Sequence, residues 1–217
     1  MKESTNKEKV LKRLRKALLH KTPNPYPQMD YETNVFVQSS DPLEILFAER
    51  LTAAGGKFIF CENELEFGES LIGLAQQKGW NQFFCKEYRI KYFLDNYQFP
   101  YRFADADFAG VEVGLTLCES LVARTGSVMV SSKQLSGRRL PFYAPIHAVL
   151  AYTSQLVPDV KEAINMVKNK YEDTMPSMLS MISGPSRTAD VEKTVIFGAH
   201  GPKELYVFLV DDSSTSL

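Results

Sequence analysis

Hydrophobic and polar positions alternate along most of the chain in a way that predicts strands and helices in turn. Short apolar runs, typical of buried strands, occur at residues 57–61 and 82–85. Apolar residues recur at helical spacing over 64–78, which Gly79 ends, and again over 87–96. Strands and helices that alternate at these lengths imply crossover connections, so the pattern predicts a largely parallel, layered sheet.

The same alternation extends to both sides of this region. Asp41-Pro42 predicts a helix with Asp41 as N-cap and proline at its first position, and Gly55-Gly56 end that helix. A strand is expected before it at 34–37. Further strands are predicted at 114–116, 121–123, 127–130, 145–151, 178–182 and 205–210, and a helix from Asp159 to about Tyr171.

A basic amphipathic helix is predicted at the start of the chain, over residues 5–20. Its apolar positions follow helical spacing: Val10, Leu11, Leu14, Ala17 and Leu18. The proline-rich stretch 22–27 cannot be helical, so residues 1–28 are interpreted as a helix and linker, and 29–217 as a single α/β domain. The helix could pack on the domain or on a partner. It could also lie on a membrane surface, although it carries no aromatic anchor.

Composition narrows the classes of function. The 217 residues are 44% hydrophobic and 24% charged, which is typical of a globular chain with one substantial core. A net charge of -1 argues against nucleic acid as the partner. Neither a signal core nor an apolar run of membrane-spanning length is recognised, so the expectation is a cytoplasmic protein without stable membrane insertion.

The three cysteines, Cys61, Cys85 and Cys118, are far apart in the sequence. They lack the close spacing of zinc and iron–sulfur ligands, and their number is odd, which argues against a disulfide framework. We therefore expect reduced, buried thiols, no metal site and no cofactor in this chain.

The main candidate site is the polar segment 183–190, which follows the predicted strand 178–182. Gly184 permits a turn, and Asp190 could cap a following short helix. Arg187 is its only cation, and a guanidinium matches a carboxylate or phosphate. The candidate ligand-binding residues are Ser183, Gly184, Ser186, Arg187, Thr188 and Asp190. The alternative is that Arg187 and Asp190 pair and merely brace the loop.

Other turns could complete an anion pocket with this segment. Thr125, Gly126 and Ser127 offer hydroxyls and backbone N–H groups at a tight turn, although a simple hairpin turn is the alternative. His200 and Gly201 lie in a second glycine turn, where His200 could be an acid–base group or a loop brace. These turns are expected to converge with 183–190 at one edge of the sheet.

Three more features leave alternatives open. Glu119 could act as a nucleophile, although a lone glutamate is more often a solvated charge. The basic loop 136–139 could cover a negative ligand or be a surface turn. His147, among apolar residues, is most simply a hydrogen-bonded core residue.

The segment Ser183-Gly-Pro-Ser-Arg-Thr-Ala-Asp-Val-Glu192, followed by Gly198-Ala-His-Gly-Pro202 and an apolar last strand, resembles the signature of the lactate-utilisation (LUD domain) family, in its protein C branch. The turn 124–127 is similar to the same family's Thr-Gly-Ser/Thr turn, with Arg124 where many members carry an acid. The resemblance covers roughly residues 40–210. It implies a three-layer α/β/α sandwich, similar to sugar-phosphate isomerases and coenzyme A transferases, behind the N-terminal helical arm.

The resemblance also implies a role in oxidising L-lactate to pyruvate, beside partner proteins that carry iron–sulfur clusters. Without cluster-type cysteines, this chain fits the cluster-free, non-redox component, which would bind a small anionic ligand. A stand-alone isomerase or acyl/CoA-transferase-like enzyme, using Glu119 or His200, is the alternative. The resemblance does not identify catalytic residues for this component, so whether the chain is itself an enzyme stays open.

Overall fold

A computed structural model of the chain describes residues 5–19, 23–29, 33, 36, 39–102, 110–191 and 194–213. The chain forms two compact units, 1–38 and 39–217. The first contains α1 (Asn6–Leu19), which begins at a capping box, because Thr5 and Glu8 exchange backbone-to-side-chain hydrogen bonds of 2.8 and 3.3 Å. No residue of α1 is buried. The strand expected at 34–37 lies outside the described residues except for Phe36.

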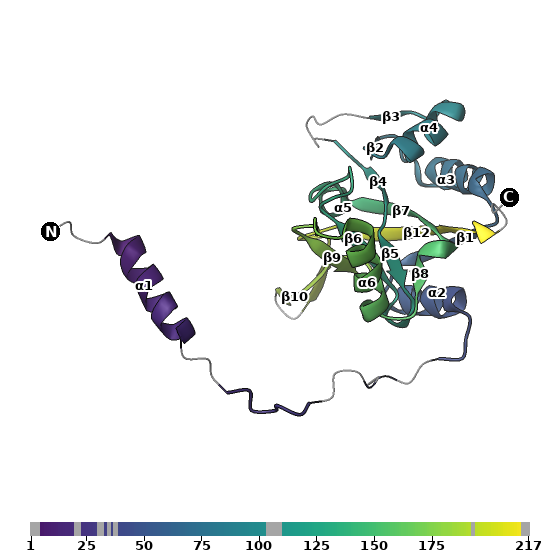
Figure 1. The fold of residues 1–217 in the computed structure, drawn as a ribbon. Helices are drawn as coiled ribbons and strands as arrows, with labels where there is room; N and C mark the ends of the chain where they lie inside the picture. Colours follow the sequence, from purple (N-terminus) through teal and green to yellow (C-terminus); the bar gives the residue numbers. More distant parts are fainter. Residues whose placement is uncertain are drawn as a thin grey trace. The chain divides into compact units, whose positions relative to one another are not determined.

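The second unit is built on a six-stranded sheet in the order β1-β12-β7-β4-β2-β3 (Figure 1). Its strands are β1 (Lys57–Cys61), β2 (Phe83–Cys85), β3 (Tyr101–Arg102), β4 (Val113–Leu117), β7 (Ile146–Tyr152) and β12 (Glu204–Val210). Every neighbouring pair in this sheet is parallel. The predicted parallel sheet is therefore confirmed.

The helices of this unit begin and end largely where local signals place them. They are α2 (Leu43–Ala53), α3 (Glu64–Lys78), α4 (Tyr88–Asn96), α5 (Leu140–Tyr143) and α6 (Val160–Tyr171), with short 3-10 turns η1 (Ala123–Thr125) and η2 (Thr153–Gln155). Gly79 ends α3 in the left-handed conformation, and the Asp159 side chain caps α6. The predicted cap of α2 is wrong: Pro42 is its N-cap, and Asp41 bonds Ser39 instead.

Helices cover both faces of the sheet, which confirms the predicted α/β class. Side chains of β7 alternate, with Leu150 on the face packed by α3 and α4, and Val149 on the face packed by α2. In β12, Phe208 lies on the face packed by α3 and α4, and Val207 lies on the face packed by α2. Because both faces are covered, the two inner strands are apolar almost throughout.

A second sheet of four strands lies on the α2 side, and the sequence did not separate it from the first. Its order is β8 (Leu156–Val157), β5 (Ser120–Val122), β6 (Ser127–Ser131) and β9 (Leu179–Ile182). The strands β6 and β9 are antiparallel, whereas β5 and β8 are parallel. Helix α6 covers the outer face of this sheet through Ala163 and Val167.

This sheet changes the setting of the segment 183–190. We expected the segment to follow a strand of the parallel sheet, but β9 belongs to the mixed sheet. The expected short helix after Asp190 is also wrong, because β10 (Arg187–Val191) pairs antiparallel with β11 (Thr194–Phe197). None of the helices in the described ranges is long and apolar enough to cross a bilayer.

Candidate functional site

Of the three segments predicted to converge, 183–190 contacts each of the other two. Ser127 Oγ and Ser183 Oγ share a hydrogen bond of 2.6 Å, and Ser127 Oγ donates to Thr125 Oγ1 over 2.7 Å. The backbone N–H of Ser186 donates to the Pro202 carbonyl over 2.8 Å, which joins the turn of His200 and Gly201 to the same segment. The segment 183–187 therefore lies between the other two turns.

Arg187 is directed at the end of α2. Its Nη2 donates a hydrogen bond to the carbonyl of Ala54, an orphan acceptor at the helix C-terminus. Gly184 approaches the same carbonyl so closely that an added Cβ would overlap the Ala54 oxygen. Thr188 lies in β10, half-buried. The Asp190 side chain is outside the described part of the structure, so its pairing with Arg187 stays a prediction.

Arg124, which precedes the Thr125 turn, is paired across to α6. Its Nε and Nη2 donate to the two oxygens of Asp159, each over 2.8 Å. This bidentate bond from Arg124 lowers the pKa of Asp159, and burial opposes the change only in part. Arg124 thus fixes the start of α6 to η1.

Glu119, the first catalytic candidate, is a buried and fully bonded carboxylate. Its oxygens accept hydrogen bonds from Ser131 Oγ (2.5 Å), Tyr171 OH (2.8 Å) and Lys170 Nζ (2.7 Å). His200, the second candidate, is exposed on its turn. Glu119 therefore positions the end of α6 rather than facing solvent.

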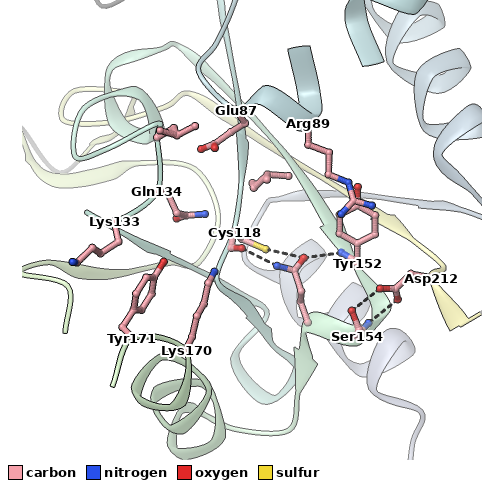
Figure 2. Close-up of a pocket in the computed structure, with 13 residues that line it drawn as sticks. Glu87, Arg89, Cys118, Lys133, Gln134, Tyr152, Ser154, Lys170, Tyr171 and Asp212 are labelled. Atoms are coloured by element: carbon pink, nitrogen blue, oxygen red, sulfur yellow. Dashed lines mark hydrogen bonds between the residues drawn. The ribbon is translucent and has the colours of Figure 1, made fainter. Parts of the chain in front are cut away.

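A cavity of about 440 Å³ lies beside this group, at the carboxyl ends of β2, β4, β7 and β12 (Figure 2). Its lining comprises Glu87, Arg89, Leu117, Cys118, Lys133, Gln134, Leu135, Tyr152, Ser154, Gln155, Lys170, Tyr171 and Asp212. Sequence reasoning did not select any of these residues for a site. The available signal was the run of polar residues directly after each of these strands.

The cavity lies where the strand order reverses. From β2 the chain passes through α4 to β3 at one edge of the sheet, whereas from β4 it passes through β5 and β6 to β7 in the opposite direction. α4 packs on one face of the sheet, and β5 and β6 lie on the other. Open α/β sheets place ligands at such a switch point, outside the carboxyl ends of the strands.

One side of the cavity is organised by Glu64 on α3. Arg89 donates to Glu64 Oε1 through Nε (3.1 Å) and Nη2 (2.6 Å), and Tyr152 OH donates to the same oxygen over 2.7 Å. The Arg89 guanidinium also lies over the Tyr152 ring, 4.2 Å from its centre. Burial and the bond to Glu64 raise the pKa of Tyr152, so its hydroxyl stays protonated.

The opposite side is organised by Glu119. Burial is the largest single effect on the pKa of Lys170 and lowers it, but the hydrogen bond to Glu119, the Glu119 charge and Tyr171 together outweigh burial and raise the pKa. Burial and the same carboxylate raise the pKa of Tyr171. Lys170 is therefore a cation, and Tyr171 a neutral hydroxyl, at the cavity wall.

Hydrogen bonds between loops form the base of the cavity. Gln155 Nε2 donates to the carbonyl of Cys118 over 2.8 Å, and its Oε1 accepts from the Tyr152 N–H over 2.9 Å. Asp212 accepts from the Ser154 N–H and hydroxyl at 2.9 and 2.5 Å, which ties the end of β12 to η2. Across the described ranges, no group of three or more His, Cys, Asp or Glu side chains could hold a metal ion.

The thiols should be unreactive in the folded protein. Burial raises the pKa of Cys61 to about 11 and that of Cys85 to about 12, and burial with the nearby Glu119 charge raises that of Cys118. Only the thiolate is nucleophilic. At about pH 8 we expect a thiol reagent such as DTNB to label the native chain very slowly and all three cysteines in denaturant. Fast labelling of a native cysteine would contradict this prediction.

Lys170 should matter to stability because its partner is buried. The Glu119 side chain is 1% exposed, so Lys170→Met leaves a buried carboxylate without its cation. Removing one member of a buried pair costs about 3 kcal/mol. The Lys170 side chain is 57% exposed, so water screens part of the interaction, and we expect a loss of about 1–2 kcal/mol in urea unfolding. The double variant Lys170→Met/Glu119→Gln should recover most of it. Equal stability of the Lys170→Met variant and the parent chain would disprove this account.

Comparisons with solved structures support the fold. A crystal structure of a DUF162 family protein from Deinococcus radiodurans superimposes with a TM-score of 0.57 at 18% sequence identity. The match covers 77% of this chain and 96% of that one. At this identity it shows a shared fold alone.

Comparisons with curated sequences and a family model point to one family. An uncharacterised protein of Neisseria meningitidis is 36% identical over 106 residues, covering 49% of this chain and 42% of that protein. Lactate utilization protein C of Bacillus subtilis is 30% identical over 102 residues, covering 46% and 42%. The chain thus spans less than half the length of these relatives. The LUD domain model matches residues 45–210, so the chain belongs to the LUD domain family, as its sequence signature predicts.

Proposed function

We propose that this chain is the cluster-free component of an L-lactate utilisation system. In this proposal it binds a small anionic ligand, while partner proteins with iron–sulfur clusters oxidise L-lactate to pyruvate. Relatives named lactate utilization protein C support the pathway. The proposed ligand binding is supported by the cavity at the switch point, which is lined by Arg89, Lys133 and Lys170 among others.

Two places could hold the anion, and the cavity is the better supported. In the segment 183–188, Arg187 already donates to the Ala54 carbonyl and the loop is docked on α2. The cavity instead offers an open, concave volume at the sheet edge where ligands of α/β proteins bind. If the segment does bind an anion, Arg187→Ala should weaken binding by about 1.5–3 kcal/mol.

The alternative function, a stand-alone isomerase or acyl/CoA-transferase-like enzyme, would need Glu119 or His200 to reach a substrate. The Glu119 side chain is 1% exposed and accepts three hydrogen bonds, an arrangement that favours a positioning role. A nucleophilic carboxylate needs an open approach to the reacting carbon. We therefore favour the binding component.

Growth on L-lactate as sole carbon source tests the proposal. Deleting the gene should abolish this growth but not growth on glucose, and the parent gene should restore it. Because cavity binding needs Arg89, the Arg89→Gln variant should fail to restore growth, while Arg187→Gln should restore it. Normal lactate growth of the deletion strain would refute the pathway, and rescue by Arg89→Gln but not Arg187→Gln would move the site to the 183–188 segment.

Partner proteins are tested separately. A tagged chain should co-purify with proteins that carry iron and sulfide when cells grow on L-lactate. Recovery of the tagged chain alone, with full activity on a small substrate, would favour the stand-alone enzyme instead.

A further inference from the structure

We infer that the cavity takes a hydroxylated ligand with an anionic group at each end, a sugar diacid rather than lactate itself. The inference rests on the proposed function only in taking the cavity as the ligand site. It is carried by the placement of the cations, by the hydroxyl-binding groups between them and by the size of the cavity.

The first anion-binding end is Arg89. Its Nε and Nη2 are used for Glu64, and no contact of its Nη1 is seen among the described residues. The side chain is 59% exposed, yet Glu64 and the Tyr152 ring hold it in one orientation. A guanidinium held in this way can donate to a carboxylate with little further loss of side-chain freedom.

The second end is formed by Lys133, Lys170 and Tyr171. Figure 2 shows these side chains on the opposite side of the cavity from Arg89, with Cys118 and Gln134 between. Lys170 gives one hydrogen bond to Glu119, and an ammonium has three donors, so donors remain for a ligand. Among the described side chains, none pairs with the Lys133 ammonium. A ligand that bonds at both ends would place one anionic group at each.

The groups between the two ends suit hydroxyls. Glu87, a carboxylate, and Gln134, a neutral amide, line this part, whereas Asp212 and Ser154 lie on the Arg89 side and bond each other. A carboxylate repels an anion but accepts a hydrogen bond from a hydroxyl, so Glu87 and Gln134 favour a polyhydroxylated middle section.

The cavity volume also favours a ligand larger than lactate. The cavity of about 440 Å³ lies in the range typical of sites for drug-sized ligands. Lactate, one of the smallest hydroxy acids, would leave most of it to water and could contact only one end. A sugar diacid spans more of the cavity and meets both sets of cations.

Three sugar derivatives of equal carbon number test the inference on the full chain by calorimetric titration. Glucarate has two carboxylates, gluconate has one and sorbitol has none. We expect glucarate to bind about tenfold more tightly than gluconate, the ratio that one charge-assisted hydrogen bond supplies, and sorbitol and L-lactate to bind more weakly still. Equal affinity for glucarate and gluconate, or no glucarate binding, would overturn the inference.

Two variants locate the ends. In Arg89→Gln the ratio of glucarate to gluconate affinity should fall to about one, because a single cationic end remains. In Lys133→Gln the ratio should fall but stay above one, because Lys170 remains at that end. Lys133 is exposed and outside any ion pair of the described side chains, so its replacement should not disturb folding. A ratio unchanged in both variants contradicts the two-ended site. Lactate-dependent growth stays the separate test of the proposed function, so the two can fail independently.

Discussion

Replacing Gly126 with alanine is expected to destabilise the protein by about 2–5 kcal/mol. Gly126 has φ +59°, a conformation that costs an L-residue strain energy. An added Cβ would also lie within 2.5 Å of the Arg50 carbonyl carbon and overlap the backbone nitrogen of Leu51. These are backbone atoms of α2, so relief requires the helix to move away from η1. The melting temperature should fall by roughly 10 °C.

Gly79 provides the matched control. It also has a positive φ, +69°, but nothing lies within 4 Å of the position of its added Cβ. Gly79→Ala should therefore cost only the conformational strain, about 1 kcal/mol. If both variants lose the same stability in thermal unfolding, the close approach of α2 to the Gly126 turn is not what the glycine is needed for.

This comparison also shows which parts of the fold were predictable. α3 and α6 were predicted nearly to the residue, because Gly79 and Asp159 act on the helix they terminate or cap. The strands β7 and β12 were predictable from their apolar runs alone, because such a run indicates a buried strand whichever strands lie beside it. Signals of this kind lie within a few residues of the element they specify.

The second sheet and the cavity depend on pairing between distant residues, and local signals do not contain it. A strand pattern at 127–131 is the same whether the strand joins the parallel sheet or pairs with β9, more than 40 residues later. Arg89 and Lys170 meet one cavity only because β2 and β4 are neighbours in the sheet. The rule that open α/β sheets bind ligands at the carboxyl ends of their strands does not extend to β9, because β9 belongs to the mixed sheet.

The family resemblance helped with the fold more than with the site. The signature segment around Arg187 identified the family, and the LUD domain match over 45–210 confirms it. In the structure that segment is docked on α2 through the Ala54 carbonyl. A sequence signature can therefore mark a segment that holds the fold together as readily as one that binds a ligand.

His147 should make the protein sensitive to mild acid. The residue is fully buried between β4 and β12, and its Nε2 shares a hydrogen bond of 2.8 Å with Thr116 Oγ1. Burial lowers the pKa of His147 to about 3. In the unfolded chain the pKa returns to about 6.5. Between about pH 6.5 and 3, His147 is protonated in the unfolded state but neutral in the native state. The free energy of unfolding therefore falls as the pH drops through this range.

The size of this effect can be measured before carboxylates contribute. At about pH 5 the difference in protonation corresponds to a loss of about 2 kcal/mol, a sizeable part of a typical domain stability. His147→Gln keeps a partner for Thr116 but cannot take up the proton. Urea unfolding at about pH 7 and 5 should therefore show a loss in the parent chain about 2 kcal/mol larger than in the variant. An equal loss in both would mean that His147 is protonated in the native state as easily as in the unfolded one, and that the core around Thr116 admits the charge.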